Sequence, residues 1–237
     1  YTVAREFRKL NTEQELVMIC ADDAVNYAKP TLSNALVGNK APEQIALGDA
    51  EKMSAQLNMR IEKNTWVKSI DAENHLLSLE KDGVESTLTY AKLVLAIGAN
   101  PIRLAISGDA SDDIHVVNNL SDYTAFRKQI DLNHDKRVVI LGAGLIGCEF
   151  ANDLQNTGHK VTVIDLATQP LCRLLPAHVA SAFKQGLEDT GVHFVLGTTV
   201  EKVIEVQRIS QDPISLESKM GHEEDSKIGD LIPDESA

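Results

Sequence analysis

The residues between 137 and 165 constrain the fold of this chain more than any other stretch. Residues 137–141 predict a buried strand, because Arg137 is followed by four apolar residues that are largely β-branched. Residues 142–147 follow at once and read Gly-Ala-Gly-Leu-Ile-Gly, a G-x-G-x-x-G pattern. A helix is predicted over 145–157, and Gly158 supplies its stop. The order of strand, glycine-rich loop and helix predicts a nucleotide-binding α/β unit.

A second strand completes this unit. It is predicted over 160–164 and ends in Asp165, which lies 23 positions after Gly142. Gly142 and Gly144 permit a tight turn and a close approach of the backbone to a pyrophosphate, while Gly147 lets helix and strand pack closely. A carboxylate at 165 accepts ribose hydroxyls and repels a 2′-phosphate, so the pattern favours NAD over NADP. A merely structural turn is the alternative, and the presence of every part in order disfavours it.

The beginning of the chain resembles this unit. Residues 12–20 align with residues 157–165 at a constant offset of 145, which predicts a second nucleotide-binding half. Val3, Phe7 and Leu10 are expected to form the apolar face of its helix, with a strand over 16–20. The counterparts of Gly142 and Gly144 would precede Tyr1, so we expect the chain to be truncated at its N-terminus.

The segments around these two halves predict further elements. Three strand-like stretches, the last two joined by a turn at Asp82-Gly83, indicate a small antiparallel insert. A buried strand ending in Gly98 is predicted next, followed by a linker. Beyond Asp165, the sequence predicts a helix and one more strand. In chain order the ranges are 67–71, 76–80 and 84–89 for the insert, 92–98 for the buried strand, 103–113 for the linker, 177–190 for the helix and 192–196 for the last strand.

Charge and composition exclude several functions. The net charge is -12 and the isoelectric point near 5.0, so nucleic acid or an anionic membrane surface would be repelled. No run of 18 apolar residues crosses a bilayer, and we expect a cytoplasmic protein. The three cysteines, Cys20, Cys148 and Cys172, form no Cys-x-x-Cys pair and are expected to be buried free thiols. The scattered histidines give no metal site, and no serine lies in a nucleophile elbow.

These observations predict an α/β fold with two Rossmann-like dinucleotide-binding domains. We expect a partial first dinucleotide-binding domain over residues 1–105, and an NAD-binding domain that is incomplete at its end over residues 106–207. Residues 208–237 carry eight acids and three basic residues and no aromatic residue, which predicts a poorly ordered acidic tail.

Four segments resemble a known family, the FAD-dependent pyridine nucleotide reductases that feed small electron carriers, and within it the rubredoxin–NAD reductases. The resemblance covers residues 1–206. The loop at 137–154 is shared by many reductases, whereas Tyr-Ala-Lys-Pro-Thr-Leu-Ser at 27–33 is more discriminating. The segments are 26–33, 90–101, 137–154 and 173–176.

The resemblance implies that residues 1–105 are a partial FAD-binding domain and that residues 106–207 bind NADH. Lys29 and Glu149 would lie beside the isoalloxazine ring, as an ion pair on the nicotinamide side, without acting as an acid or base. Cys20 and Ala21 would meet the adenosine, the Val67 backbone the adenine end, and Ala96 to Gly98 the flavin cofactor. The implied FAD residues are thus Cys20, Ala21, Lys29, Val67, Ala96, Gly98 and Glu149, and the implied NAD residues are Gly142, Gly144, Ile146, Gly147 and Asp165.

The resemblance also implies a reaction, in which electrons pass from NADH through FAD to rubredoxin. Because no dithiol stands beside the flavin position, the electrons must leave directly to another carrier. A ferredoxin reductase, a flavorubredoxin reductase or an NADH oxidase is an alternative within enzymes. The family's first glycine-rich loop, its later Gly-Asp segment and its C-terminal domain are absent from 1–237, so a non-catalytic NAD-binding fragment is the alternative of another class.

Overall fold

The computed structural model describes residues 1–108, 111–132 and 137–200, and the chain forms two compact units. Unit 1 comprises Tyr1–Arg137 and Asn152–Lys160, and unit 2 comprises Val138–Ala151 and Val161–Ala237. The predicted acidic tail, 208–237, and the last residues of the predicted NAD domain lie outside the described residues.

The first layer of unit 1 packs two helices against a parallel pair of strands. Helix α1 (Thr2–Leu10) and helix α3 (Ala50–Leu57) accompany strands β1 (Val17–Ile19) and β4 (Arg60–Glu62). Their core is a cluster of four buried residues with partly buried neighbours. The cluster contains Ala4, Met53, Leu57 and Met59, and its neighbours are Tyr1, Leu16, Met18 and Ile61.

The helix and strand predicted at the start of the chain are confirmed, but of the predicted apolar face of α1 only Phe7 is partly buried. Val3 and Leu10 are 54% and 87% exposed, and Ala4 is the buried residue. The helix approaches α3 through this small side chain. Arg8 supports the approach, since its Nε donates to the Leu57 carbonyl at 2.7 Å, at the end of α3.

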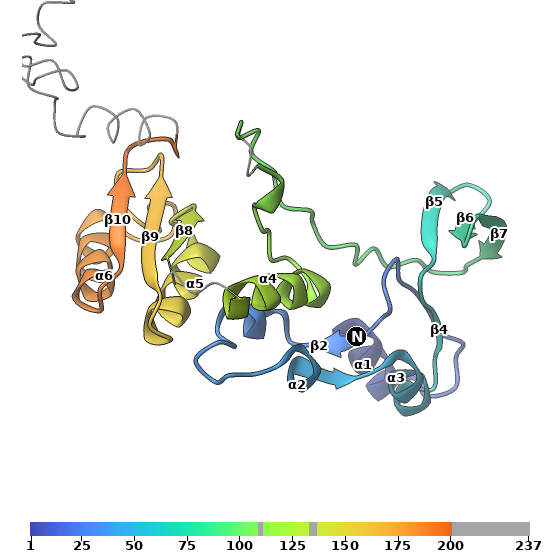
Figure 1. Ribbon diagram of the computed structural model, residues 1–237. Helices are drawn as coiled ribbons and strands as arrows, with labels where there is room; N and C mark the ends of the chain where they lie inside the picture. Colours follow the sequence, from blue (N-terminus) through green and yellow to red (C-terminus); the bar gives the residue numbers. More distant parts are fainter. Residues whose placement is uncertain (109–110, 133–136, 201–237) are drawn as a thin grey trace, which may run out of the picture. The chain divides into compact units, whose positions relative to one another are not determined.

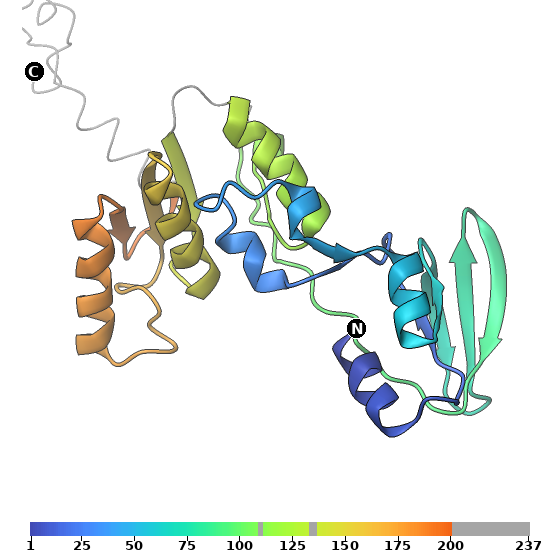
Figure 2. The same cartoon turned by 90° about the horizontal axis from the view of Figure 1, so that it is seen from below.

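The second layer of unit 1 is built around helix α4 (Leu120–Leu132), which the sequence patterns did not predict. It contacts the short 3-10 helix η1 (Lys29–Ser33) and helix α2 (Pro42–Ile45), as Figure 2 shows. Strands β2 (Asn26–Tyr27) and β3 (Ala46–Gly48) pair antiparallel beside them. The buried residues of this layer include Leu32, Ala35, Leu36, Ile45, Tyr123 and Phe126.

The predicted antiparallel insert is confirmed. Strands β5 (Trp66–Asp71), β6 (Leu76–Lys81) and β7 (Val84–Thr89) form one sheet in the order β5-β6-β7 (Figure 1). The turn between β6 and β7 holds Asp82 at φ 51° and Gly83 at φ 76°, as a two-residue hairpin of type I′ requires.

The strand predicted at 92–98 is wrong. These residues are all exposed and form no strand, and Ile97 is 88% accessible to solvent. An apolar run specifies a buried strand only if a neighbouring strand satisfies its backbone groups. In the described ranges, β1 and β4 pair with each other and no strand pairs with 92–98.

The strands and helices from residue 137 to residue 196 confirm the predicted alternation. Their sheet has the order β10-β9-β8, and β10 pairs parallel with β9. Gly158, with φ 85°, follows the end of α5, where the His159 N–H donates to the Leu154 carbonyl. The elements are β8 (Arg137–Leu141), α5 (Leu145–Asn156), β9 (Lys160–Asp165), α6 (Ala177–Asp189) and β10 (His193–Leu196).

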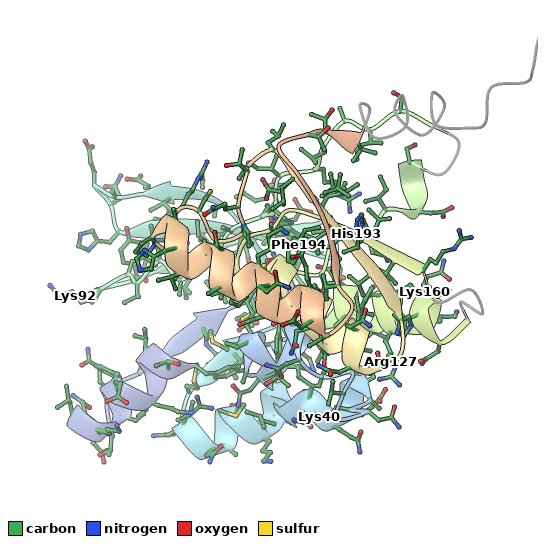
Figure 3. The ribbon with its side chains drawn as sticks, turned by 90° about the vertical axis from the view of Figure 1, so that its left-hand side faces the viewer. Lys40, Lys92, Arg127, Lys160, His193 and Phe194 are labelled. Atoms are coloured by element: carbon green, nitrogen blue, oxygen red, sulfur yellow. The ribbon has the colours of Figure 1, made fainter. Side chains whose placement is uncertain are left out.

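Helix α6 lies along β10, where Figure 3 labels His193 and Phe194. Phe194 is buried and its neighbour His193 is exposed, the alternation expected of a strand. Lys184 of α6 holds its ammonium 5.9 Å from the centre of the Phe194 ring. The helix therefore covers the apolar side of this edge strand.

Candidate dinucleotide-binding sites

The loop between β8 and α5 has the backbone conformation that its glycines predict. Gly142 lies at φ 110°, a conformation that an L side chain rarely adopts. A Cβ atom placed on Gly142 or Gly144 would meet no heavy atom within 4 Å, so the outer side of the loop is open. An anion can approach the loop backbone there.

Gly147 has a different role from the first two glycines. A Cβ atom at this position would overlap the carbonyl oxygen of Gly142 and lie 3.1 Å from its carbonyl carbon. The side chain of Ile140, in β8, would be 3.5 Å away. The glycine thus allows the first turn of α5 to approach both the loop and the strand, as predicted.

The N-terminus of α5 faces the open loop. The Cys148 N–H donates to the Gly144 carbonyl at 3.0 Å, which closes the first helical turn. Ile146, in that turn, is 52% exposed. A helix of this length carries a partial positive charge at its N-terminus, so the turn suits a diphosphate.

The carboxyl ends of the three strands meet at this loop. Gly142, after β8, donates its N–H to the Ile164 carbonyl of β9 at 2.8 Å. Thr198, after β10, donates its N–H to the Asp165 carbonyl at 3.2 Å. The structure therefore brings Asp165 and the glycine loop to one edge of a parallel sheet, where nucleotides bind in open α/β folds.

The Asp165 carboxylate contacts the glycine loop directly. Its Oδ2 accepts from the Ala143 N–H at 2.5 Å, and its Oδ1 accepts from the Ala167 N–H at 2.7 Å. Each carboxylate oxygen has two lone pairs, so both oxygens can still accept a hydroxyl proton. Asp165 can thus brace the loop and bind a ribose.

The loop that contains Leu171 is hydrogen-bonded to the glycine loop, and no sequence pattern predicted this contact. Leu171 lies at φ 53° although it is not a glycine, and its N–H donates to the Ala143 carbonyl at 2.9 Å. The Cys148 Sγ donates to the same carbonyl at 3.5 Å. No sequence pattern signals a leucine in the left-handed region, so local reasoning could not find this contact.

The three cysteines differ in their surroundings. Cys148 is buried, and desolvation together with the nearby Asp165 raises the pKa of its thiol to about 11. Cys20 is partly buried, and burial raises the pKa of its thiol as well. Cys172 is exposed, so the expectation that all three thiols are buried is wrong for this residue. All three are free.

Cys20 and Ala21 lie at the carboxyl end of the parallel strands of unit 1. The Cys20 N–H donates to the Glu62 carbonyl at 2.9 Å, and the Cys20 carbonyl accepts from the Thr65 N–H at 2.8 Å. Ala21 follows and is exposed. The pair thus occupies the same place relative to its strands as Asp165 does in unit 2.

Lys29 is joined to the segment of Ala96 and Gly98 through Asn118. The Lys29 ammonium donates to the Asn118 Oδ1 at 2.7 Å, and the Asn118 Nδ2 donates to the Ala99 carbonyl at 3.0 Å. Gly98, at φ 67°, turns the chain just before this carbonyl. Lys29 is therefore connected through Asn118 to the residue that follows Gly98, and sequence reasoning missed Asn118.

The sequence does contain a signal near Asn118. Asn119 and Asp122 have the spacing of a helix cap, and the structure forms both of its hydrogen bonds. The start of α4 could have been predicted from this pair. The bond from Asn118 to Lys29 could not, because the two residues are 89 positions apart.

The other implied FAD residues are not joined to this group. Val67 lies in β5 and is 42% exposed. Lys29 belongs to unit 1 and Glu149 to unit 2, and their ion pair stays a prediction.

Within 1–108, 111–132 and 137–200, no group of three or more His, Cys, Asp or Glu side chains could hold a metal ion. The helices of these same ranges include none with the length and apolarity needed to span a membrane.

Two curated relatives resemble the chain over most of its length. The rubredoxin–NAD(+) reductase of Acinetobacter baylyi is 72% identical over 206 residues, which cover 87% of this chain and 52% of the relative. The rubredoxin–NAD(+) reductase of Alcanivorax borkumensis is 40% identical over 86% of this chain and 52% of its own length. The chain therefore spans about half the length of these relatives.

Solved structures share the fold. The water-forming NADH oxidase of Lactobacillus brevis, bound to NADH, is 26% identical with a TM-score of 0.74, over 83% of this chain and 44% of its own. The NADH:rubredoxin oxidoreductase of Clostridium acetobutylicum has a TM-score of 0.66 at 22% identity, over 81% of this chain and 49% of its own.

A family model agrees with these likenesses and with the two α/β units. It describes the pyridine nucleotide-disulphide oxidoreductases and matches residues 1–228. The chain belongs to the pyridine nucleotide-disulphide oxidoreductase family.

Proposed function

We propose that this chain provides the FAD-binding and NADH-binding parts of an oxidoreductase that passes electrons from NADH through FAD to rubredoxin. The observation that carries the proposal is the meeting of the glycine loop and Asp165 at one sheet edge, in a chain 72% identical to a rubredoxin–NAD(+) reductase. The chemistry belongs to the cofactors, and the chain binds and orients them.

Unit 2 supplies the NADH site in this proposal. The loop over Gly142 and Gly144 is open to a diphosphate, and the first turn of α5, with Ile146 and Gly147, stabilises its charge. Asp165 accepts the ribose hydroxyls and repels a 2′-phosphate.

An engineered relative supports this assignment of Asp165. The Lactobacillus brevis oxidase becomes an NADPH oxidase through five substitutions, and its engineered form is 25% identical to this chain. Two of them replace a glycine and an aspartate 18 positions apart, which is the spacing of Gly147 and Asp165. Loss of the carboxylate there accompanies the change from NADH to NADPH.

Unit 1 supplies the FAD site in this proposal. Cys20 and Ala21 stand at the carboxyl ends of parallel strands, where the adenosine would bind, with the backbone of Val67 at the adenine end. Lys29 and the turn at Ala96 to Gly98 form the side of this unit that we assign to the flavin ring.

Rubredoxin is the proposed acceptor because both curated relatives are rubredoxin–NAD(+) reductases. The three cysteines are free and none forms a Cys-x-x-Cys pair, so an internal dithiol does not take the electrons. Unpaired cysteines also fit a reducing compartment, and we place the protein in the cytoplasm.

The test compares acceptors. The full-length protein, supplied with NADH and FAD, should reduce oxidised rubredoxin faster than ferredoxin or oxygen under equal conditions. A rate with rubredoxin no higher than with ferredoxin would contradict the proposed acceptor. A rate highest with oxygen would favour an NADH oxidase, which the likeness to the Lactobacillus brevis enzyme keeps as a candidate.

A non-catalytic NAD-binding fragment is the candidate of another class. The exposed, unpaired segment at 92–98 favours it, because this segment includes Ala96 and Gly98 of the proposed FAD site. A colourless purified chain that binds NAD, and loses this binding on Asp165→Ala, would support a fragment. A yellow protein bleached by NADH would exclude it.

A further inference from the structure

We propose that Asn118 is a positioning residue that fixes the Lys29 ammonium beside the turn after Gly98. This inference rests on the proposed function, because Lys29 and Gly98 are two of the residues assigned to the FAD site. None of the family motifs in the sequence includes Asn118, and its positioning role follows from its contacts with Lys29 and Ala99.

The first contact fixes the lysine. Lys29 begins η1, and Pro30 follows it, which restricts the backbone of this short helix. The side chain is exposed, so a free Lys29 would sample many rotamers. The bond of 2.7 Å to the Asn118 Oδ1 selects one position for the ammonium.

The second contact fixes the turn. Residues 92–100 are exposed and form neither helix nor strand, so backbone pairing does not hold them. The Asn118 Nδ2 donates to the Ala99 carbonyl at 3.0 Å, one residue after Gly98. The same amide thus determines the distance between the ammonium and the turn.

Hydrogen bonds at the start of α4 hold Asn118 itself in place. The Asn118 N–H donates to the Asp122 Oδ2 at 2.9 Å, and the Asp122 N–H donates to the Asn119 Oδ1 at 2.8 Å. Asn118 is therefore held by the capped first turn of α4.

An amide suits this position better than other side chains. It offers one acceptor for the ammonium and one donor for the carbonyl, whereas a carboxylate offers acceptors only and a leucine offers neither. An amide also leaves the positive charge of Lys29 without a countercharge from residue 118. That charge stays available to an electron-rich ring or a phosphate.

The experiment measures FAD affinity and flavin potential in the full-length protein. Asn118→Leu should weaken FAD binding about threefold to tenfold, the net contribution of a typical intramolecular hydrogen bond, because Lys29 stays in place and loses only the partner that positions it. Asn118→Asp should make the flavin midpoint potential more negative, because the new carboxylate neutralises Lys29 and disfavours an electron-rich ring.

Asn119→Ala is the matched control. It removes a cap from the same helix end but touches neither Lys29 nor Ala99, so FAD affinity and potential should stay at the wild-type values while thermal stability falls. If all three variants behave alike, Asn118 acts through α4 and the inference is wrong.

A double variant tests whether the effect runs through the lysine. In a Lys29→Met protein, Asn118→Asp should no longer shift the potential, and an undiminished shift would overturn the inference. A wild-type protein that binds no FAD would instead refute the proposed function, so the two failures are distinguishable.

Discussion

Replacing Asp165 should change which dinucleotide the protein prefers. In the proposed site, Asp165→Ala removes a charged acceptor from the ribose of NADH, and one hydrogen bond to a charged group contributes about 1.5–3 kcal/mol. Since 1.4 kcal/mol corresponds to a factor of ten, the NADH dissociation constant should rise about tenfold to 100-fold. NADPH should bind no worse than before, because the repulsion of its 2′-phosphate disappears.

The structure adds a second effect of this substitution. Ala143 loses the carboxylate that its N–H donates to at 2.5 Å, so the glycine loop loses one brace. The contact of Leu171 with the Ala143 carbonyl remains and should keep the loop folded. We therefore expect Asp165→Ala to change the nucleotide affinity more than the free energy of unfolding.

The assay is a fluorescence titration with NADH and with NADPH on the same preparations. Asp165→Asn keeps the shape and removes the charge, so it should fall between wild type and Asp165→Ala for NADPH. Asp189→Ala, at the end of α6, removes a carboxylate that bonds to Gln185 and serves as the control. An NADH dissociation constant within twofold of wild type in Asp165→Ala, with no gain for NADPH, would refute the reasoning.

Three further predictions concern stability. Gly142→Ala forces an L side chain to φ 110° and should lower the free energy of unfolding by about 1–3 kcal/mol in urea titrations. Asp153→Asn should cost about 1–3 kcal/mol, because this carboxylate, 2% exposed, accepts from the N–H groups of Leu36 and Val37 at 2.8 and 2.9 Å. Burial raises the pKa of Cys148 from 9.0 to about 11. Between pH 9 and pH 11 the thiol therefore loses its proton when the protein unfolds. The free energy of unfolding therefore keeps its full value below pH 9 and falls as the pH rises toward 11. Its decrease with pH should be smaller in Cys148→Ala.

Each of these predictions has a control. Gly186→Ala, in the interior of α6 with open space around it, should raise stability by about 0.5–1 kcal/mol, and equal losses at both glycines would contradict the role of φ at Gly142. Asp189→Asn should leave stability within about 0.5 kcal/mol of wild type, and a similar value for Asp153→Asn would contradict its buried role. An unchanged alkaline slope in Cys148→Ala would show that another group titrates there.

The sequence predicted those parts of the fold that are determined by residues close to one another along the chain. The unit from Arg137 to Asp165 was predicted in full, because apolar runs, glycines and a terminal acid specify strand, turn and helix locally. The hairpin at Asp82-Gly83 was predicted for the same reason.

The parts that were missed depend on distant residues. The 92–98 segment has the composition of a buried strand, but its state depends on a partner strand. Lys29 was identified through the family resemblance, whereas its hydrogen-bond partner Asn118 lies 89 positions away. Asp153 bonds to a backbone 117 positions away, and a carboxylate in a helix carries no local sign of this.

We propose that the full-length protein passes electrons from NADH through FAD to rubredoxin. The most direct test is an anaerobic double-mixing experiment in which the full-length protein meets NADH first and oxidised rubredoxin second. We predict that NADH bleaches the flavin absorbance, and that rubredoxin restores it while becoming reduced, with two rubredoxins consumed for each NADH. A flavin that NADH does not bleach, or that stays reduced in the presence of oxidised rubredoxin, would contradict the account.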